Sequence, residues 1–384
     1  MCRYTCLGCV RRATSDVAPV FVRPATRDCF CATLYARLCY KPNLEPITHF
    51  LTGAVLGRAG FNRKTALATA TMTLAAEAPD LDIFWRFKGP VYYFAHHRGF
   101  THSFLGLFLM SGLTVGFMYL AWLIRGKRTN IPDLPARWGL LFLFAYIAGL
   151  SHLLLDFTNN YGVRPFWPFW EKWYSWDIVF IFEPALYIIL IAALVLPLFF
   201  RRARKFPRGQ RTAAVALVAV AVLYVVRDYE HRQAVHALSQ VEYESNAGTP
   251  ETPLRVSVYP YFWTVTRWST VAETRDFFAT TDINSLTGAL NHEELAFYPK
   301  PLETPATLAA KQSYLGRAYL DWARHPLLSQ KASGQNTIVD FRDLRYDYPR
   351  FRGRVALSAW VELNRNLQVV REGFGSRVQD PPAK

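Results

Sequence analysis

The chain has 384 residues, of which 51% are hydrophobic, 15% aromatic and only 19% charged, and its net charge is +15. Soluble domains carry about a quarter charged residues, so this composition argues against an ordinary soluble protein and favours a membrane protein. The basic residues lie in short loops between apolar runs and form no single basic face, which argues against nucleic acid as a partner.

The N-terminal segment differs from the rest of the chain. All six cysteines lie within its first 39 residues. Cys6 and Cys9 form a CxxC pair, but no second pair follows at zinc-finger spacing. The segment also lacks the long apolar run of a secretory signal. We therefore expect residues 1–43 to be no part of the native protein, with a natural start at Leu44. A disordered cytoplasmic tail is the alternative.

Four apolar stretches are typical of membrane helices: Phe104–Ile124, Trp138–Phe157, Ile178–Phe200 and Thr212–Val226. The last has fifteen residues and needs flanking residues to cross a hydrocarbon core of about 30 Å. Two weaker helices precede them, Ile47–Phe61 and Thr65–Ala78, which can form a hairpin that partly enters the membrane. Gly53, Gly57 and Gly60 suit close helix packing in this hairpin.

Basic residues in the loops predict the orientation in the membrane. The loop after the first strong span carries four basic residues between Arg125 and Arg137, and the loop after the third carries six between Arg201 and Arg211. Both loops should face the cytoplasm, together with the basic turn Arg58–Lys64. The tryptophan-rich loop Thr158–Trp176 should face outward. The last span then places residues 227–384 on the extracytoplasmic side.

Residues 227–384 read as a small α+β domain. Asp228–Tyr243 is typical of an amphipathic helix and Pro301–Arg324 of further helix. The expected strands are Arg255–Phe262, Val265–Thr274, Asp276–Thr281, Thr337–Leu344 and Val355–Arg371. The predicted fold is mainly α, a polytopic transmembrane bundle over residues 44–226 that carries a metal site, followed by this extracytoplasmic domain.

The ionisable residues in or near the predicted spans all fall at their outer ends. They are His49, Asp80, Asp82, His97, Arg98, His102, His152 and Asp156. Such groups are costly in a membrane and are candidates for function. The segment SHLLLD places His152 and Asp156 one turn apart on one helix face. In HHRGFTHS, Gly99 permits a sharp bend, so that His97 and His102 can turn toward one centre.

Mixed histidine and aspartate ligands favour zinc, manganese or iron over calcium or magnesium. We expect zinc, with manganese or iron as alternatives, and the number of ligands allows a two-metal centre. The expected metal ligands are His49, Asp80, Asp82, His97, His102, His152 and Asp156. Asp82 is in addition a candidate catalytic base. Arg98 has a forked cationic head that suits a phosphate or carboxylate of the substrate.

Several neighbouring residues also have purely structural interpretations. His96 is expected to lie outside the ligand set, and Glu77 can be a structural partner of Arg98. Asp177 can cap the third span. Glu183 precedes Pro184 and can satisfy backbone groups that the proline leaves without partners. The isolated histidines of the C-terminal part are interpreted as structural.

Four ordered motifs, PITHFLTGAVLGRAG, APDLDIF, HHRGFTHS and GLSHLLLDFTNNYGVRPFWPF, resemble the membrane-bound metal-dependent hydrolase family of bacteria, the YdjM-like inner-membrane proteins. The resemblance covers about residues 45–200. It implies a metal-dependent hydrolase, and the eight residues named above as functional candidates fall on the family's motif positions. Glu183 stands where members often have an aspartate, which weakens a metal role there.

The combined prediction is a hydrolase of the bacterial inner membrane. A metal-activated water would attack a lipid-linked or phosphate-bearing substrate at the outer face of the bilayer. A metal or solute transporter is a second hypothesis, but a transit path needs polar groups across the whole bilayer, and the cytoplasmic halves of the spans hold almost none. A structural membrane protein that binds a partner through its C-terminal domain is the third.

Overall fold

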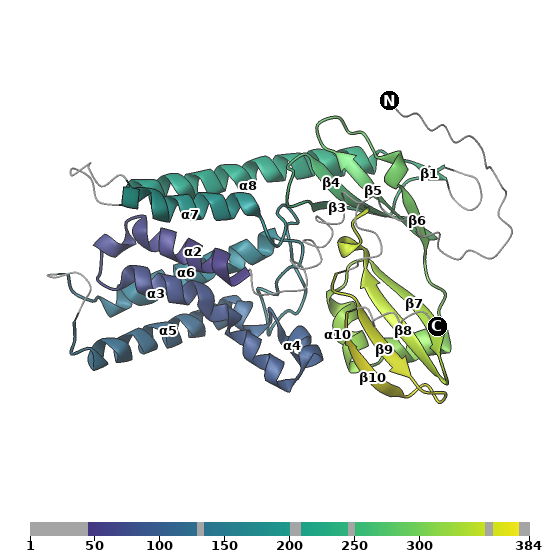
Figure 1. The fold of residues 1–384 in the computed structure, drawn as a ribbon, viewed down its shortest axis with the longest axis horizontal. Helices are drawn as coiled ribbons and strands as arrows, with labels where there is room; N and C mark the ends of the chain where they lie inside the picture. Colours follow the sequence, from purple (N-terminus) through teal and green to yellow (C-terminus); the bar gives the residue numbers. More distant parts are fainter. Residues whose placement is uncertain (1–44, 129–133, 200–208, 245–249, 350–355, 376–384) are drawn as a thin grey trace, which may run out of the picture.

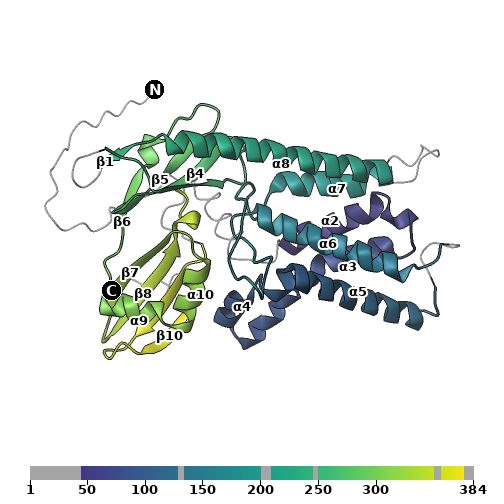
Figure 2. The ribbon, with the colours of Figure 1, turned by 180° about the vertical axis from the view of Figure 1, so that it is seen from behind.

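The computed structural model describes residues 45–128, 134–199, 209–244, 250–349 and 356–375. The cysteine-rich segment 1–43 and the basic residues predicted for a cytoplasmic loop at 201–208 lie outside this described part. Within it, the chain forms a set of helices followed by antiparallel sheets, and the two groups lie at opposite ends of the molecule (Figures 1 and 2).

The first half of the described chain is helical, with short 3₁₀ segments labelled η. In chain order these are α2 (Glu45–Arg58), η1 (Phe61–Arg63), α3 (Ala68–Glu77), η2 (Ala78–Lys88), α4 (Pro90–His96), η3 (Phe100–His102), α5 (Phe104–Ile124), α6 (Trp138–Thr158), α7 (Pro184–Phe199) and α8 (Gln210–Ser239). Helix α3 packs against α2 and α6, α5 packs against α6, and α7 pairs with α8.

Helices α2 and α3 approach each other closely because two glycines of α2 face α3. A Cβ atom at Gly53 would lie 2.6 Å from the carbonyl oxygen of Met72, and one at Gly57 would lie 2.6 Å from Cα of Thr69. Real side chains do not tolerate such distances, so both positions require glycine. The hairpin of small residues expected from the sequence is present in this form.

Three described helices are long and apolar enough to cross a membrane: α5, α6 and α8. The prediction of a third span over Ile178–Phe200 was wrong at its start, because the helix begins only at Pro184 and has 16 residues. Proline favours the first turn of a helix, where its missing N–H is not needed. The preceding residues Ile178, Val179 and Phe180 are buried in non-helical chain.

Helix α8 is longer than predicted. The sequence suggested one helix ending at Val226 and a second beginning at Asp228, but the structure shows a single helix of 30 residues. No glycine or proline lies between the two segments, so the backbone continues through the change from apolar to polar composition. The predicted domain boundary at 226/227 therefore falls inside α8, which runs from the bundle to the sheets (Figure 1).

The C-terminal part contains two four-stranded antiparallel sheets, ordered β3-β4-β5-β6 and β10-β9-β8-β7, and a small pair β1-β2. The strands are β1 (Tyr243–Glu244), β2 (Pro250–Glu251), β3 (Arg255–Pro260), β4 (Arg267–Glu273), β5 (Phe277–Asn284), β6 (Ala296–Pro299), β7 (Pro326–Ser333), β8 (Asn336–Asp343), β9 (Ala359–Leu363) and β10 (Val369–Phe374). Helices α9 (Pro305–Lys311) and α10 (Tyr314–Trp322) replace the single helical region expected at 301–324.

The sheets and the nearby loops of the bundle share one apolar core. Phe94 of α4 and Tyr161 of the loop after α6 belong to the same buried cluster as Trp322 and the inner residues of β8 and β9. The ring of Phe94 meets that of Trp322 edge-on at 5.3 Å. The C-terminal part is thus packed directly onto the end of the bundle that carries the candidate site.

Candidate metal centre

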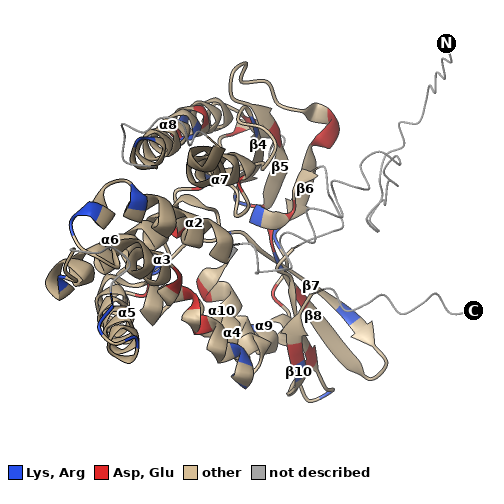
Figure 3. Cartoon of the chain, turned by 60° about the vertical axis from the view of Figure 1, so that its left-hand side comes forward, with Lys and Arg blue, Asp and Glu red and all other residues tan. Residues whose placement is uncertain are grey.

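The site residues come from four helical elements that meet at one end of the bundle. His49 lies in the first turns of α2, Asp80 and Asp82 in η2, His102 at the end of η3, and His152 and Asp156 in the last turns of α6. Figure 3 shows acidic segments beside α3 and α4, and basic segments by α5 and α6 and also beside α4. The clustering expected at one face is thus present in the fold.

His152 and Asp156 form the base of the cluster. Both are buried, and Nε2 of His152 lies 3.3 Å from Oδ2 of Asp156, as their i and i+4 positions on α6 require. Nδ1 of His152 lies 2.7 Å from the carbonyl oxygen of Ala76 at the end of α3. Nδ1 therefore carries a proton and donates it to this carbonyl. Nε2 points into the cluster, where a neutral ring would offer its lone pair to a metal.

His102 has the same arrangement on the facing element. Its Nδ1 lies 3.0 Å from Oγ1 of Thr101 and 3.5 Å from Oδ2 of Asp82, and both oxygens can accept a proton from Nδ1. Its Nε2 lies 3.0 Å from Nε2 of His152 and 3.4 Å from Oδ2 of Asp156. Two imidazole nitrogens and a carboxylate thus converge in a buried site. Histidine nitrogen and aspartate oxygen are ligand types that zinc takes in proteins.

Asp80 and His49 complete the cluster. Oδ1 of Asp80 lies 3.5 Å from Nε2 of His102 and 3.7 Å from Nε2 of His152. Nε2 of His49 lies 3.4 Å from Oδ1 of Asp156, and its ring stacks on that of His152 at 3.7 Å. Two overlapping groups have ligand atoms close enough for one ion each, His49 with Asp80 and His152, and His102 with His152 and Asp156.

His97 and Asp82 form a second layer beside the cluster. Both oxygens of Asp82 lie within hydrogen-bond distance of Nδ1 of His97, at 3.0 and 3.1 Å, and Oδ2 also accepts the backbone N–H of Arg98 at 2.9 Å. Burial alone would raise the pKa of the Asp82 carboxyl, but the charge and hydrogen bond of His97 hold it below its usual value. The carboxylate is engaged with these donors, and neither residue enters the ligand groups of the described chain.

Arg98 is placed differently from the expectation that it faces a substrate. Its side chain is 1% exposed, and its guanidinium lies 2.9 Å from Oδ1 of Asp156. It also donates to Oδ1 of Asn159 and to the carbonyl oxygen of Gly162, at 3.2 and 3.1 Å. The backbone has a φ of 52° at this residue. Arg98 therefore holds Asp156 and the loop after α6 in position.

The structural interpretations of the neighbouring residues can be compared with their contacts. His96 lies outside the cluster, with Nδ1 2.9 Å from the carbonyl oxygen of Tyr92. Asp177 contacts Ser175 and Arg324, and α7 begins seven residues after it. Glu183 forms a buried ion pair with Arg227 of α8, whose guanidinium lies 2.6 Å from its Oε2.

Two residues that support the site were not identified from the sequence. Asn159 binds Arg98, and Arg164 donates to the carbonyl oxygens of Ala95 and His97 at 3.1 and 3.3 Å. Both lie in the segment NNYGVR directly after α6. The sequence signal for these two residues is their position directly after a span that carries ligands. This position does not predict their contacts, which depend on the fold of the loop.

The residues present fit a bound cation. Among the described residues, Oδ2 of Asp80, Oδ2 of Asp156 and Nδ1 of His49 are buried polar atoms without a hydrogen-bond partner. Buried polar atoms are normally satisfied, and such groups point to an ion or water. A small cavity of about 20 Å³ lies on the other side of His49 and Asp156, next to Glu183 and Leu186, and is not lined by the other ligand candidates.

Residues 44–234 match the model of the YdjM inner membrane protein family. The chain is also similar to YfhP of Bacillus subtilis (strain 168), an uncharacterized protein, with 29% identity over 157 residues. That alignment covers 39% of this chain and 45% of the relative, so this chain spans less than half of the relative's length. No solved structure matches the chain. Together with the three apolar helices, the family match supports a YdjM-like membrane protein.

Proposed function

We propose that this protein is a metal-dependent hydrolase of the inner membrane, which cleaves a phosphate-bearing or lipid-linked substrate at the outer face of the bilayer. The observation that carries the proposal is the meeting of Nε2 of His102 and Nε2 of His152, 3.0 Å apart, with carboxylates of Asp80 and Asp156 around them. Nδ1 of each ring has a partner outside this group, so Nε2 of the neutral ring would be available to a metal.

Five residues would hold the metal: His49, Asp80, His102, His152 and Asp156. Zinc suits this mixed histidine and aspartate set, with manganese or iron as alternatives, and the two overlapping ligand groups are compatible with one or two ions. When bound, such a cation supplies Lewis acidity, which lowers the pKa of water to near neutral and polarises the bond under attack.

The protein's own residues orient this centre. Asp82 accepts the proton of Nδ1 of His97 in a hydrogen bond and lies beside Nδ1 of His102. It is also the candidate general base. The carbonyl of Ala76 fixes the tautomer of His152. Arg98 balances the charge of Asp156 and positions it, so we propose that Arg98 acts through Asp156.

The orientation in the membrane follows from the basic loops. Arg125, Lys127, Arg128 and Arg137 lie at the ends of α5 and α6 that are opposite the candidate centre. Basic loops favour the cytoplasm, so the centre and the C-terminal sheets would face outward. A centre at this depth lies near the lipid headgroups, which is the reason to propose a lipid-linked or phosphorylated substrate.

The distribution of ionisable groups favours a hydrolase over a transporter. Helix α5 contains no Asp, Glu, Lys, Arg or His, and α6 contains only His152 and Asp156, both in its last two turns. The buried hydroxyls of Ser111 and Thr114 in α5 donate to carbonyls of their own helix. The described residues of α5 and α6 thus offer ligands at one end and no continuous polar path.

The test combines metal analysis with hydrolysis assays on the full chain purified in detergent. Metal content is measured by plasma mass spectrometry for wild type, His102→Ala, His152→Ala and the control His96→Ala, whose histidine lies outside the cluster. The same proteins are assayed with bis(p-nitrophenyl) phosphate and with phosphatidic acid in mixed micelles. We expect metal and activity in wild type and His96→Ala, and the loss of both in the other two.

Two results would count against the proposal. Equal metal content in all four proteins would remove the ligand assignment. The second result is metal binding that depends on His102 and His152, with no metal-dependent hydrolysis of either phosphate ester. The protein would then be a metal-binding membrane protein, and phosphoester hydrolysis as proposed would be excluded.

A further inference from the structure

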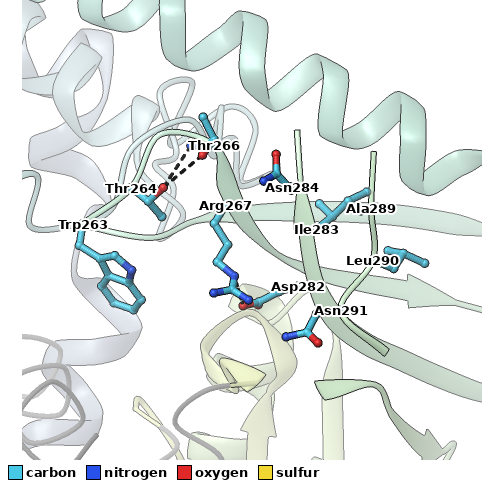
Figure 4. A pocket seen from close by; sticks show the side chains of 10 residues that line it. All are labelled: Trp263, Thr264, Thr266, Arg267, Asp282, Ile283, Asn284, Ala289, Leu290 and Asn291. Atoms are coloured by element: carbon cyan, nitrogen blue, oxygen red, sulfur yellow. Dashed lines mark hydrogen bonds and ion pairs between the residues drawn. The ribbon is translucent and has the colours of Figure 1, made fainter. Parts of the chain in front are cut away.

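A polar cavity lies in the C-terminal part, away from the candidate metal centre. Its volume is about 670 Å³, within the range of ligand pockets. It is lined by residues from the loop between β3 and β4, the start of β4, the end of β5 and the segment after it: Trp263, Thr264, Thr266, Arg267, Asp282, Ile283, Asn284, Ala289, Leu290 and Asn291. Figure 4 shows these side chains.

The charged groups in the cavity pair with each other. Arg267 and Asp282 are the charged residues among those that line it, and Nε of Arg267 lies 3.0 Å from Oδ2 of Asp282. The hydroxyl of Tyr261 donates to the other oxygen of Asp282 at 2.6 Å. Burial and the nearby Glu294 raise the pKa of the Asp282 carboxyl to about 7. Asp282 is 1% exposed, whereas the side chain of Arg267 is 29% exposed, so the cavity offers guanidinium N–H groups of Arg267 as donors.

Two asparagine amides are held in fixed orientations around the cavity. Oδ1 of Asn284 accepts the backbone N–H of Leu286 at 3.0 Å, and Oδ1 of Asn291 accepts that of Glu293 at 3.2 Å. The amide nitrogens of both side chains therefore point the other way, and in Figure 4 they lie on the side of Arg267. The walls carry further hydroxyls from Thr264 and Thr266.

Trp263 supplies the apolar wall opposite these groups. Its side chain is 38% exposed, and Figure 4 shows its indole across the cavity from Arg267. The ring is held by Tyr261 and Phe262, both with centroids at 4.5 Å. A partly exposed indole beside amide and guanidinium donors suits a ring that is apolar on its face and carries hydroxyls on its edge. Sugars have this property.

The cavity is anchored to α8 at the place where that helix leaves its apolar segment. Arg227 donates to the carbonyl oxygen of Thr264 at 2.7 Å, and Ser285, next to Asn284, donates to Glu230. Arg227 directly follows Val226, the last residue of the apolar run. Both sides of the cavity are thus fixed within about a turn of the expected membrane surface, in reach of soluble sugars and of glycolipid headgroups.

We propose that this cavity binds a neutral sugar unit, with the sugar ring on Trp263 and its hydroxyls on Arg267, Asn284 and Asn291. The site is separate from the metal centre, and the proposal does not depend on hydrolase activity. A free oligosaccharide and the headgroup of a glycolipid share the chemistry that the cavity would recognise, so the experiment tests each source.

The test uses isothermal titration calorimetry of the full chain in a polyoxyethylene detergent, which carries no sugar. The probes are cellobiose, maltose, N,N′-diacetylchitobiose, a galactosyl diacylglycerol in mixed micelles, and inorganic phosphate. Trp263→Ala and Asn284→Ala are compared with Trp170→Ala, which removes an exposed tryptophan outside the cavity. Thermal unfolding shows whether each variant is folded, and Asn284→Ala carries the test if Trp263→Ala is not.

We expect at least one sugar probe to bind, and the two cavity variants to weaken that binding by about tenfold or more, equivalent to about 1.4 kcal/mol. Trp170→Ala should bind as wild type does. Binding of the galactolipid alone assigns the site to a membrane glycolipid, and binding of a disaccharide assigns it to soluble sugar. The proposal is overturned if no sugar probe binds, if folded cavity variants bind as wild type does, or if phosphate binds more tightly than every sugar.

Discussion

Nε2 of His102 and Nε2 of His152 face each other at 3.0 Å, within hydrogen-bond distance. With both rings neutral and protonated on Nδ1, a divalent cation in the cluster would take both Nε2 atoms as ligands, so metal binding and the stability of the fold should be linked.

Removal of metal should therefore destabilise the wild-type protein. Ligand binding to the folded state adds about 2.7 kcal/mol of stability when free metal is at 100 times its Kd. We expect EDTA to lower the thermal midpoint of wild type, and added ZnCl₂ to restore it. His152→Ala should not respond to either. Scanning fluorimetry in detergent measures both proteins, and an equal response in the two would contradict a link through this centre.

Asp80 and Asp82 should differ in their effect on metal affinity. Asp80 faces the two Nε2 atoms, whereas Asp82 contacts Nδ1 atoms and the backbone of Arg98. Loss of such an orienting group costs about 10–100-fold in metal affinity. We expect Asp82→Asn to weaken zinc binding within this range and Asp80→Ala to weaken it further, in competition titrations with a chromophoric chelator. Equal losses would make Asp82 a direct ligand.

The buried pair of Glu183 and Arg227 should stabilise the junction between the bundle and the sheets. Removing one partner of a buried ion pair costs about 3–5 kcal/mol, because the other charge is left without a partner. We expect this loss for Glu183→Gln in SDS-induced unfolding followed by circular dichroism. Arg232→Gln is the matched control, since its pair with Asp228 on the same helix is largely exposed and contributes about 0.3–0.5 kcal/mol. Similar losses in both variants would show that burial does not decide the effect.

The C-terminal part should lose stability in acid through His325. This histidine is fully buried and accepts a hydrogen bond from Arg255 on Nδ1 at 2.9 Å. Burial and the nearby arginine charges lower its pKa from 6.5 to about 3. Between pH 6.5 and about pH 3, the unfolded chain therefore binds more protons than the folded chain. Stability is fully present above about pH 6.5 and falls as the pH drops toward 3, by at most about 1.4 kcal/mol per pH unit.

His325→Gln removes this titration. We therefore expect the free energy of unfolding of the variant to depend less on pH than that of wild type between pH 7 and 4. Denaturant titrations at four pH values measure the difference between the two slopes. Parallel curves would show that His325 is not buried in its neutral form.

Membrane topology can be tested with alkaline phosphatase fusions, which are active only outside the cytoplasm. We expect an active fusion after Lys384 and an inactive one after Arg128, which follows α5 in the basic loop. Expression of both fusions is checked by immunoblot. The reverse pattern would place the candidate metal centre on the cytoplasmic side.

The sequence predicted the position of the site better than its inner arrangement. The i and i+4 spacing of His152 and Asp156 and the polar ends of the spans were enough to gather the cluster, because helix geometry fixes both. Asp80 and Asp82 lie two residues apart in η2, but Asp80 faces the two Nε2 atoms and Asp82 contacts Nδ1 atoms. This difference depends on the side of the 3₁₀ helix that each side chain occupies, which the sequence alone does not give. The role of Arg98 depended on Asn159 and Gly162, which lie about 60 residues further along the chain.

The same contrast holds for the fold. The long apolar helices α5 and α6 were predicted almost to the residue, since composition alone specifies them. Strand β7 was missed because its sequence, PLLSQKAS, lacks β-branched residues and depends on pairing with β8. The start of α7 was placed too early because the buried apolar residues before Pro184 are indistinguishable by composition from a membrane segment.

The unequal lengths of the helices have a consequence for the surrounding lipid. Helices α5 and α6 have 21 residues each, about 31 Å, whereas α7 has 16, about 24 Å. The first two therefore match a hydrocarbon core of about 30 Å and α7 does not. The bilayer should be thinner beside α7 than beside α5 and α6, so that lipids with short acyl chains gather there.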